Sequence, residues 1–369
     1  MTARSTFRRV PMTLVITAAL LAACGGGAKK VAVTTTAVPT TLFLATTTTT
    51  VAPTTTTVAP TTTTTVPPTT VVAVKTYPFT GLPVTNEATY NRPALAIKVN
   101  NAAEARPQAG LNQADIVIEE IVEGITRFMA VYQSTDADKV GSIRSARTSD
   151  LDLLRGLGKP LFAWSGANGY VMNAVHSLPN VTDIGFDRAD SLYTIGRRLQ
   201  DYTEFFISTK AAYERAPEAS TAPVPMFSYR SAGAGPTGGS DIAKLELTLD
   251  GTHATWKWDA DKKAWLRSTD GRVHEDLDGE QLSPANVVVA FSNYRQSPAD
   301  PKSPEAVSVG EGPAWVLTGG KLIKGTWKRE TATSAYVLTD TGGRAIALTP
   351  GRTFLELPRT EQANAEPQL

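Results

Sequence analysis

Apolar runs alternate with helix-like stretches between about residues 94 and 216. Compact apolar runs predict buried strands, and apolar residues spaced three or four positions apart predict helices. The expected strands are Ala94–Val99, Ile125–Gln133, Leu161–Trp164 and Val181–Phe186. The expected helices are Ser149–Leu157, Tyr170–Ser177, Leu192–Tyr202 and Thr209–Ala216. Strands that alternate with helices indicate an α/β-like unit, here residues 77–216, with a mixed sheet.

The pattern changes after residue 216. Residues 217–239 are rich in Pro, Gly, Ser and Ala and are expected to form a linker. Short apolar runs follow, separated by hairpin-forming dipeptides such as Asp250-Gly251 and Asp270-Gly271. The expected strands are Leu245–Leu249, Ala254–Trp258, Ala264–Arg267, Val287–Phe291, Ala314–Leu317, Leu322–Trp327, Ala335–Leu338, Ala345–Leu348 and Phe354–Leu357. The sequence therefore predicts an α+β fold, in which a mostly antiparallel, β-rich unit at residues 240–360 follows the α/β-like unit.

The N-terminus has the pattern of an export signal. Three arginines precede an apolar run, Met12–Ala23, that is too short to span a bilayer as a mature helix. Residues 1–23 are therefore expected to be a signal peptide. The run ends in Leu21-Ala22-Ala23-Cys24, which resembles the lipobox of bacterial lipoprotein precursors, where the cysteine thiol receives a diacylglyceryl group. The alternative is an ordinary signal peptide with an incidental Cys24, but this is the sole cysteine of the chain, and three glycines follow it.

A low-complexity segment follows the cysteine. From Val31 to about Val74 the chain is nearly all Thr, Val, Ala and Pro, without a charged residue. Such a composition cannot bury a core, so residues 24–76 are expected to form a disordered tether. Its extended reach would be on the order of 130 Å at ~3.1 Å per residue. A disordered tail is likewise expected at residues 361–369.

Composition and charge exclude several classes of protein. The formal net charge is +1, with both signs interspersed, so no basic surface for nucleic acid is expected. With one cysteine no internal disulfide can form, and the fold must depend on core burial. The stretch Gly233–Gly238 spells G-x-G-x-x-G, but a predicted strand follows it instead of a helix, so it is not a dinucleotide site. No cofactor is expected.

Several motifs follow one another between about residues 77 and 359. They are Arg106–Leu111, Gln113–Val117, Glu123–Phe128, Gly141–Arg147 and Leu348–Thr353. In this order they resemble the YerB-like family of bacterial lipoproteins, which is catalogued as a domain of unknown function. The resemblance implies an N-terminal α/β domain and a β-rich C-terminal domain, and it implies no established activity. Where the family tends to carry a His before Leu-Tyr-Thr, this chain has Ser191.

An arginine pair is the first candidate for a site. Arg144 and Arg147 lie just before the expected helix at Ser149, which is predicted to be its N-cap. Forked guanidinium donors beside free helix N–H groups could receive a carboxylate or phosphate. The alternative is that both arginines pair internally with Asp or Glu.

A strip of acidic residues is the second candidate. Asp115, Glu119 and Glu123 would share one face if their segment is a strand, and Arg127 lies just beyond. Neighbouring carboxylates can raise one another's pKa, which makes Glu119 and Glu123 the candidates for acid/base catalysis. A solvated face or a salt-bridge network would give the same pattern. We expect a combined polar cleft, whose ligand- or partner-binding residues are Asp115, Glu123, Arg127, Arg144, Ser145 and Arg147.

Two further groups lie in the β-rich half. His274 and Asp276 could share a strand face and bind a metal, although an exposed Asp/Gly loop is the commoner explanation for such a pattern. Trp256 and Trp258 could stack on sugars or on a protein partner if exposed, and would be core residues if buried.

These observations predict a binding or regulatory module of the cell envelope. It would be held by Cys24 on the extracytoplasmic face of the bacterial membrane and would engage an envelope protein or a peptidoglycan component. No nucleophile motif is present, which favours binding over catalysis. Two alternatives are a hydrolase of envelope glycans, acting through Glu119 or Glu123, and a capture protein for a small anionic solute.

Overall fold

The computed structural model describes residues 74–199 and 202–360. They belong to one compact unit. The predicted signal peptide, Cys24, nearly all of the predicted tether and the predicted tail lie outside the described residues. Within the described part, no helix is long and apolar enough to cross a membrane.

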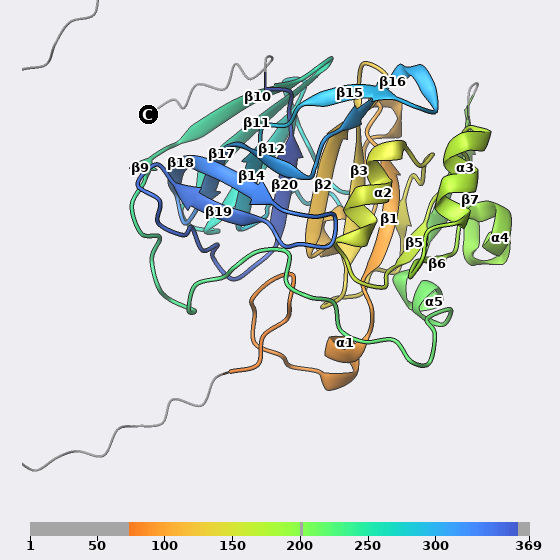
Figure 1. Ribbon diagram of the computed structural model, residues 1–369, viewed down its shortest axis with the longest axis horizontal. Helices are drawn as coiled ribbons and strands as arrows, with labels where there is room; N and C mark the ends of the chain where they lie inside the picture. Colours follow the sequence, from red (N-terminus) through yellow and green to blue (C-terminus); the bar gives the residue numbers. More distant parts are fainter. Residues whose placement is uncertain (1–73, 200–201, 361–369) are drawn as a thin grey trace, which may run out of the picture. The chain divides into compact units, whose positions relative to one another are not determined.

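A mixed sheet of eleven strands forms the centre of the structure (Figure 1). Its order is β19-β18-β17-β14-β20-β2-β3-β1-β5-β6, and β9 also pairs with β18. The strands are β1 Leu95–Asn100, β2 Ile116–Ile121, β3 Thr126–Tyr132, β5 Leu161–Ala163, β6 Thr182–Asp183, β9 Ser240–Asp241, β14 Asn286–Ala290, β17 Gly310–Thr318, β18 Lys321–Arg329, β19 Val337–Asp340 and β20 Thr353–Leu357. The predicted α+β fold with a mixed sheet is confirmed.

Strands from both halves of the chain share this sheet. The last strand, β20, runs parallel to β2 on one side and parallel to β14 on the other. The predicted linker at residues 217–239 therefore connects two stretches of sequence whose strands are hydrogen-bonded to one another. Parallel pairing also joins β1 to β5 and β5 to β6, and the other pairs of the sheet's strand order are antiparallel.

Different elements cover the two faces of the central sheet. One face shares a core cluster with a four-stranded sheet, β10–β13, and a three-stranded sheet, β4-β8-β7. These strands are β4 Val140–Gly141, β7 Tyr193–Arg198, β8 Thr203–Ile207, β10 Lys244–Leu249, β11 Thr252–Asp259, β12 Ala264–Thr269 and β13 Arg272–Val273. The other face packs against helices α2 and α3 and a hairpin, β15 Tyr294–Ser297 with β16 Asp300–Ala306 (Figure 1).

The helices are short. They are α1 Glu87–Asn91, α2 Thr148–Arg155, α3 Gly169–His176, α4 Phe186–Ala189 and α5 Thr209–Tyr213, with single 3₁₀ turns at Ala103–Ala105, Leu111–Gln113 and Asp190–Leu192. The helix predicted from Ser149 begins one residue earlier, and its N-cap is Arg147 instead of Ser149. The side chain of Asp150 accepts the backbone N–H of Arg147 at 2.6 Å. The backbone N–H at the N-cap is therefore bonded by a residue of the helix's own first turn.

The helix predicted at Leu192–Tyr202 is wrong, because this segment contains the strand β7. Its apolar residues have helical spacing, yet Ile195 is 57% exposed instead of facing a core. A Cβ on Gly196 would lie 2.6 Å from the ring of Phe206, so the glycine permits close pairing with β8. The strand predicted at Ala345–Leu348 is also wrong, since this segment makes only isolated bridges.

The middle strands of the sheet are buried on both faces. Every residue of β2 is buried, with Ile116 and Ile118 in one core cluster and Val117 and Ile121 in the other. Because side chains alternate along a strand, the adjacent acidic residues of β2 point to opposite faces of the sheet. This alternation decides which predicted site residues can meet.

Candidate functional site

Arg147 and Glu123 form a forked ion pair. The Nε of Arg147 donates to Oε1 of Glu123 at 2.6 Å, and Nη2 donates to Oε2 at 2.9 Å. The hydroxyl of Ser303, on β16, donates to the same Oε1 at 2.5 Å. Burial alone would raise the pKa of Glu123, but the bonds from Arg147 and Ser303 and the charge of Arg127 lower it to about 2. Glu123 is therefore a fixed carboxylate that cannot act as a proton donor at neutral pH.

Arg127, on β3, lies directly behind this pair. Its Nη1 donates to the backbone oxygen of Ser145 at 3.0 Å, and its Nη2 lies 3.8 Å from Oε2 of Glu123. The residue is only 6% exposed, and its Nε has no hydrogen-bond partner. Burial, together with the nearby charge of Arg147, lowers the pKa of Arg127 to about 9. The two arginines thus compete for one carboxylate.

Arg144 joins the cluster from the loop before α2. Its backbone N–H donates to the oxygen of Lys98, and its oxygen accepts from Ser165, which ties the loop to β1 and to the segment after β5. The guanidinium lies over the ring of Tyr202, 4.3 Å from its centroid, and its Nε is buried without a partner. Burial lowers the pKa of Arg144, and the positive charge of Arg147 lowers it further.

A polar cleft of about 210 Å³ opens beside the Arg147–Glu123 pair. It lies between the starts of α2 and α3 and the β15–β16 hairpin, and its lining residues are Glu123, Ser145, Arg147, Ala167, Asn168, Val171, Ser297, Ala299, Asp300 and Ser303. Asn168 caps α3 by accepting the N–H of Val171 at 3.0 Å, and it donates to the oxygen of Ala299 at 3.1 Å. The cleft is therefore built from side chains whose own positions are fixed by hydrogen bonds.

A fully buried ion cluster joins the central sheet to the start of α2, next to the cleft. Lys98, on β1, donates to Glu120 of β2 and to Oδ1 of Asp150 in α2, the latter at 2.7 Å. All three side chains are 0–1% exposed. Burial raises the pKa of Glu120, partly offset by the charge of Lys98. This cluster holds the start of α2 against the sheet, and it thereby positions Arg147, the N-cap of α2.

Two of the predicted site residues lie elsewhere. Asp115 precedes β2 and is 1% exposed, with its carboxylate accepting the backbone N–H of Ser134 at 2.7 Å. Burial raises its pKa to about 6. Glu119 points to the opposite face from Glu120 and accepts from Arg267 at 2.6 Å. The structure thus brings Glu123, Arg127, Arg144, Ser145 and Arg147 together, whereas Asp115 and Glu119 are sealed away from the cleft.

Sequence reasoning missed a second buried ion cluster. Arg267, on β12, donates at 2.6 Å to Glu119 and also at 2.6 Å to Glu356 of β20, and all three side chains are 0% exposed. Burial, and then the charge of Glu119, raise the pKa of Glu356 well above its ordinary value. A charged residue inside an otherwise apolar run, as in Phe354-Leu355-Glu356-Leu357, is the sequence signal that could have pointed to it.

His274 belongs to this buried network and not to a metal site. It is 2% exposed, and its Nδ1 contacts Arg267 Nε at 3.3 Å and Thr269 at 2.7 Å. Nε2 therefore carries the proton and donates to Gln108 at 2.8 Å. Asp276 instead accepts two backbone N–H groups. Among the described residues, no group of three His, Cys, Asp or Glu side chains could hold a metal ion.

The tryptophans of β11 contribute mainly to the core. Trp256 is 0% exposed, and its Nε1 donates to Glu356 at 2.9 Å. Trp258 is partly buried, with its ring centroid 5.0 Å from that of Trp265. Trp256 is therefore not exposed for stacking on a sugar or a partner.

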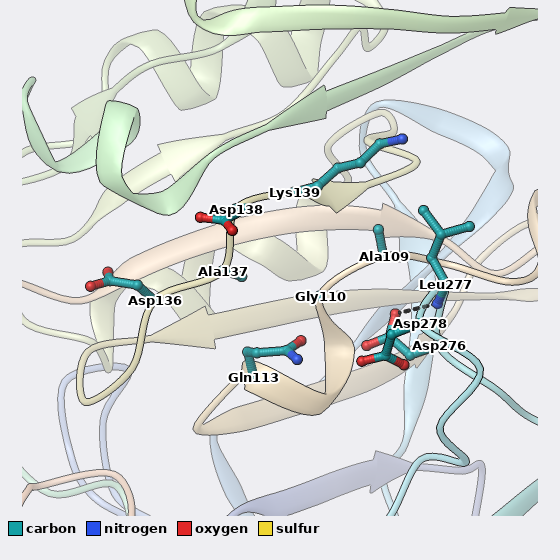
Figure 2. A pocket seen from close by; sticks show the side chains of 10 residues that line it. All are labelled: Ala109, Gly110, Gln113, Asp136, Ala137, Asp138, Lys139, Asp276, Leu277 and Asp278. Atoms are coloured by element: carbon teal, nitrogen blue, oxygen red, sulfur yellow. Dashed lines mark hydrogen bonds between the residues drawn. The ribbon is translucent and has the colours of Figure 1, made fainter.

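An acidic cleft of about 440 Å³ lies at another place on the surface (Figure 2). Asp136 and Asp138 come from the loop before β4, and Asp276 and Asp278 from the turn after β13. Figure 2 shows the first two and the last two on different sides of the cleft. The carboxylate of Asp276 is occupied by backbone N–H groups, so the four aspartates do not converge.

Two family models match the chain. The N-terminal domain of the protein of unknown function DUF3048 matches residues 79–222, and its C-terminal domain matches residues 245–355. The chain belongs to this family, the YerB-like proteins. Over 290 residues it is 28% identical to "Putative lipoprotein YerB" of Bacillus subtilis (strain 168), covering 76% of this chain and 85% of that protein.

A solved structure shows the same fold. The crystal structure of the YerB protein from Bacillus subtilis superposes with a TM-score of 0.68 and 23% sequence identity. The match covers 79% of this chain and 99% of that chain.

Proposed function

We propose that this protein is a lipid-anchored binding module on the extracytoplasmic face of the bacterial cell membrane. Cys24 would carry the acyl anchor, and the Thr/Pro-rich segment would hold the folded part away from the bilayer. The lipobox-like sequence and the relative named as a lipoprotein support the anchor. The partner would be another envelope protein or a peptidoglycan component.

The Arg147–Glu123 pair in the polar cleft is the observation that carries this proposal. A forked ion pair on an open surface, backed by a buried arginine, is an arrangement suited to recognition. Its carboxylate has a pKa of about 2 and is held by two side-chain donors, so it supplies neither a proton nor a mobile base.

The glycan hydrolase alternative is disfavoured by the same geometry. Such enzymes use two accessible carboxyl groups, one of them protonated. Glu119 is fully buried against Arg267, and Glu123 is locked as a carboxylate. The cleft lining contains no aromatic side chain on which a sugar ring could stack.

The size of the cleft favours recognition of one chemical group of a larger partner over capture of a whole solute. Sites that enclose small molecules are typically about 300–1,000 Å³. This cleft measures about 210 Å³.

In-cell crosslinking tests the proposal. The tagged full chain is compared with an Arg144→Glu, Arg147→Glu double variant, and with Arg155→Glu, Arg188→Glu as a control of equal charge change at exposed positions. Melting temperatures establish that each variant is folded. We expect one partner, or affinity for cell walls, to be lost in the first variant and kept in the second. Identical captures from both variants, or no partner and no wall affinity with the native chain, would contradict the proposal.

A further inference from the structure

Strand β10 forms an open edge of the four-stranded sheet, and among the described residues it pairs only with β11. The N–H of Trp258 donates to the oxygen of Ala243 at 2.9 Å, so the odd-numbered residues of this segment direct their main-chain groups to β11. The even-numbered residues of β10 direct theirs to the other side, where no main-chain hydrogen bond from the described part of the chain reaches them. These residues are Lys244, Glu246 and Thr248.

The other edges of the described sheets are short, irregular or covered, which is how natural proteins prevent strands from pairing with other chains. The strands β4, β6, β9 and β13 have two residues each. The strands β7 and β15 carry register shifts, and β16 contains Pro301 and Pro304. The outer side of β19 is covered, with the N–H of Ile346 donating to the oxygen of Leu338 at 2.8 Å. Among the described edge strands, β10 alone has six regularly paired residues, no proline and no covering segment.

The side chains of β10 form one buried row and one open row. Leu245, Leu247 and Leu249 are 0–3% exposed and belong to the core between this sheet and the central sheet. Lys244 and Glu246 lie on the other face, with side chains 33% and 51% exposed, and they form an ion pair with each other. The strand runs along the margin of the folded part in Figure 1. A second strand can therefore pair with β10 without any change in the core.

We propose that β10 pairs with β10 of a second copy of this chain, antiparallel and around a two-fold axis beside Leu245. Lys244 of each copy lies opposite Glu246 of the other copy. Because both residues direct their main-chain groups outward, each of these two pairs exchanges two N–H···O hydrogen bonds. The two four-stranded sheets then continue as one sheet across the axis.

The order of charges along the edge selects this register and this partner. Opposite charges directly across two strands stabilise their pairing, and like charges destabilise it. An axis beside Glu246 places two glutamates opposite each other, and an axis beside Lys244 does the same with two lysines. An axis beside Leu247 sets Glu246 against Thr248 and extends into the turn at Asp250. The axis beside Leu245 forms two Lys–Glu pairs, so the edge is complementary to itself.

The contact is short, because only Lys244, Leu245 and Glu246 of each copy form the ladder. Such a small contact is typical of weak, transient association. Lipid anchors that confine both copies to one membrane raise their effective concentration and favour the pairing. The inference goes beyond the proposed function and takes only the membrane anchor from it.

Carbodiimide crosslinking of the full chain in intact cells tests the pairing, because this reagent joins an ammonium group to a carboxylate in direct contact. A link from Lys244 of one copy to Glu246 of another joins two copies of the same peptide, which a link within one chain cannot do. We expect mass spectrometry to find this product in the native chain. Its absence from membrane-bound chains would overturn the inference.

Charge reversals test the register by sedimentation velocity of the purified full chain. Lys244→Glu and Glu246→Lys each put like charges opposite one another and should weaken association about tenfold, since two pairs change in every dimer. The double variant Lys244→Glu, Glu246→Lys should associate like the native chain. Lys328→Glu, at an exposed position of β18, is the control that should change nothing. A double variant as weak as the single ones would overturn the proposed register.

A proline tests the main-chain bonds separately from the charges. Glu246→Pro removes an outward N–H that a single copy does not use, so it should abolish association and leave the melting temperature of the monomer nearly unchanged. Glu246→Gln keeps this N–H and should weaken association only a few-fold. Association of the proline variant at the native strength would show that β10 is not the paired edge.

The anchor and the pairing can fail separately. If cell fractionation finds the chain unanchored, but the Lys244–Glu246 link forms when the purified chain is concentrated, the proposed anchor falls and the pairing stands. If the chain is anchored and neither crosslinks nor associates through β10, the pairing falls and the proposed binding function is unaffected.

Discussion

Glu119 of β2 and Glu356 of β20 are register partners on adjacent parallel strands, and both bind the guanidinium of Arg267. All three side chains are inaccessible to solvent. Burial and the charge of Glu119 raise the pKa of Glu356 well above its ordinary value, which favours its neutral form. The cluster then holds one positive and one negative charge, and it ties the β10–β13 sheet to the central sheet without a net buried charge.

Replacing Arg267 should be strongly destabilising. Arg267→Met would leave the buried carboxylate of Glu119 without its cation, which typically costs about 3–5 kcal/mol. The measurement is the free energy of unfolding in urea at neutral pH. Arg344→Met, at an exposed arginine, is the control. A loss below about 1 kcal/mol would show that the cluster is not held by this pairing.

Glu356→Gln should be tolerated much better, because glutamine resembles the neutral carboxyl group. The folded pKa of Glu356 is raised above the unfolded value, so its contribution to stability is complete at low pH and is lost as the pH rises through the folded pKa. Unfolding free energies measured from about pH 5 upward should therefore fall less steeply in the variant than in the native chain. Equal slopes would contradict the assignment of a neutral Glu356.

Asp115 should also make the free energy of unfolding fall as the pH rises, but over a lower pH range than Glu356. Its pKa is about 6 in the folded chain against 3.8 in the unfolded chain, so stability is lost as the pH rises from about 4 to about 6. The total is on the order of 3 kcal/mol, since one pKa unit corresponds to about 1.4 kcal/mol. Urea titrations of native and Asp115→Asn protein at several pH values test this. The slope between about pH 4 and pH 6 should be shallower in Asp115→Asn and unchanged in Asp278→Asn, an exposed control.

The Glu123–Arg147 pair should have the opposite effect, so that its contribution to stability is lost as the pH falls. The folded pKa of Glu123 is about 2 against an ordinary 4.5, so its contribution is present above about pH 4.5 and is lost as the pH falls towards 2. A double-mutant cycle of Glu123→Gln and Arg147→Gln should give a coupling of about 1 kcal/mol at neutral pH, since the pair is partly exposed. The coupling should shrink at about pH 3. A coupling of zero at neutral pH would remove the basis for a fixed carboxylate in the cleft.

Elements with a strong local pattern could be predicted from the sequence. The apolar runs of β1, β3 and β20 and the capped helices α2 and α3 were all found close to their real bounds. The segment of β7 was wrongly predicted as a helix, because this exposed edge strand carries apolar residues at helical spacing. The strands β15 and β16 were missed, since exposed polar positions interrupt their apolar pattern. The strand β8 was missed as well.

The candidate site was predictable only in part. Arg147 and Glu123 were expected to share a cleft, and they do so because the β2–β3 turn meets the start of α2. Glu119 could not be placed correctly, because its partner Arg267 lies 148 residues away and its face of β2 is set by long-range packing. The unused donors of Arg127 depend on distances in three dimensions that no spacing of residues reveals.

The position of β20 also determines when the fold can close. Synthesis delivers a chain from its N-terminus, yet β20, residues 353–357, fills the gap between β2 and β14 in the middle of the sheet. Until those residues emerge, β2 and β14 each present an open strand edge, the kind of surface on which chains associate wrongly. The central sheet can therefore be completed only when β20, near the C-terminal end, pairs with both β2 and β14.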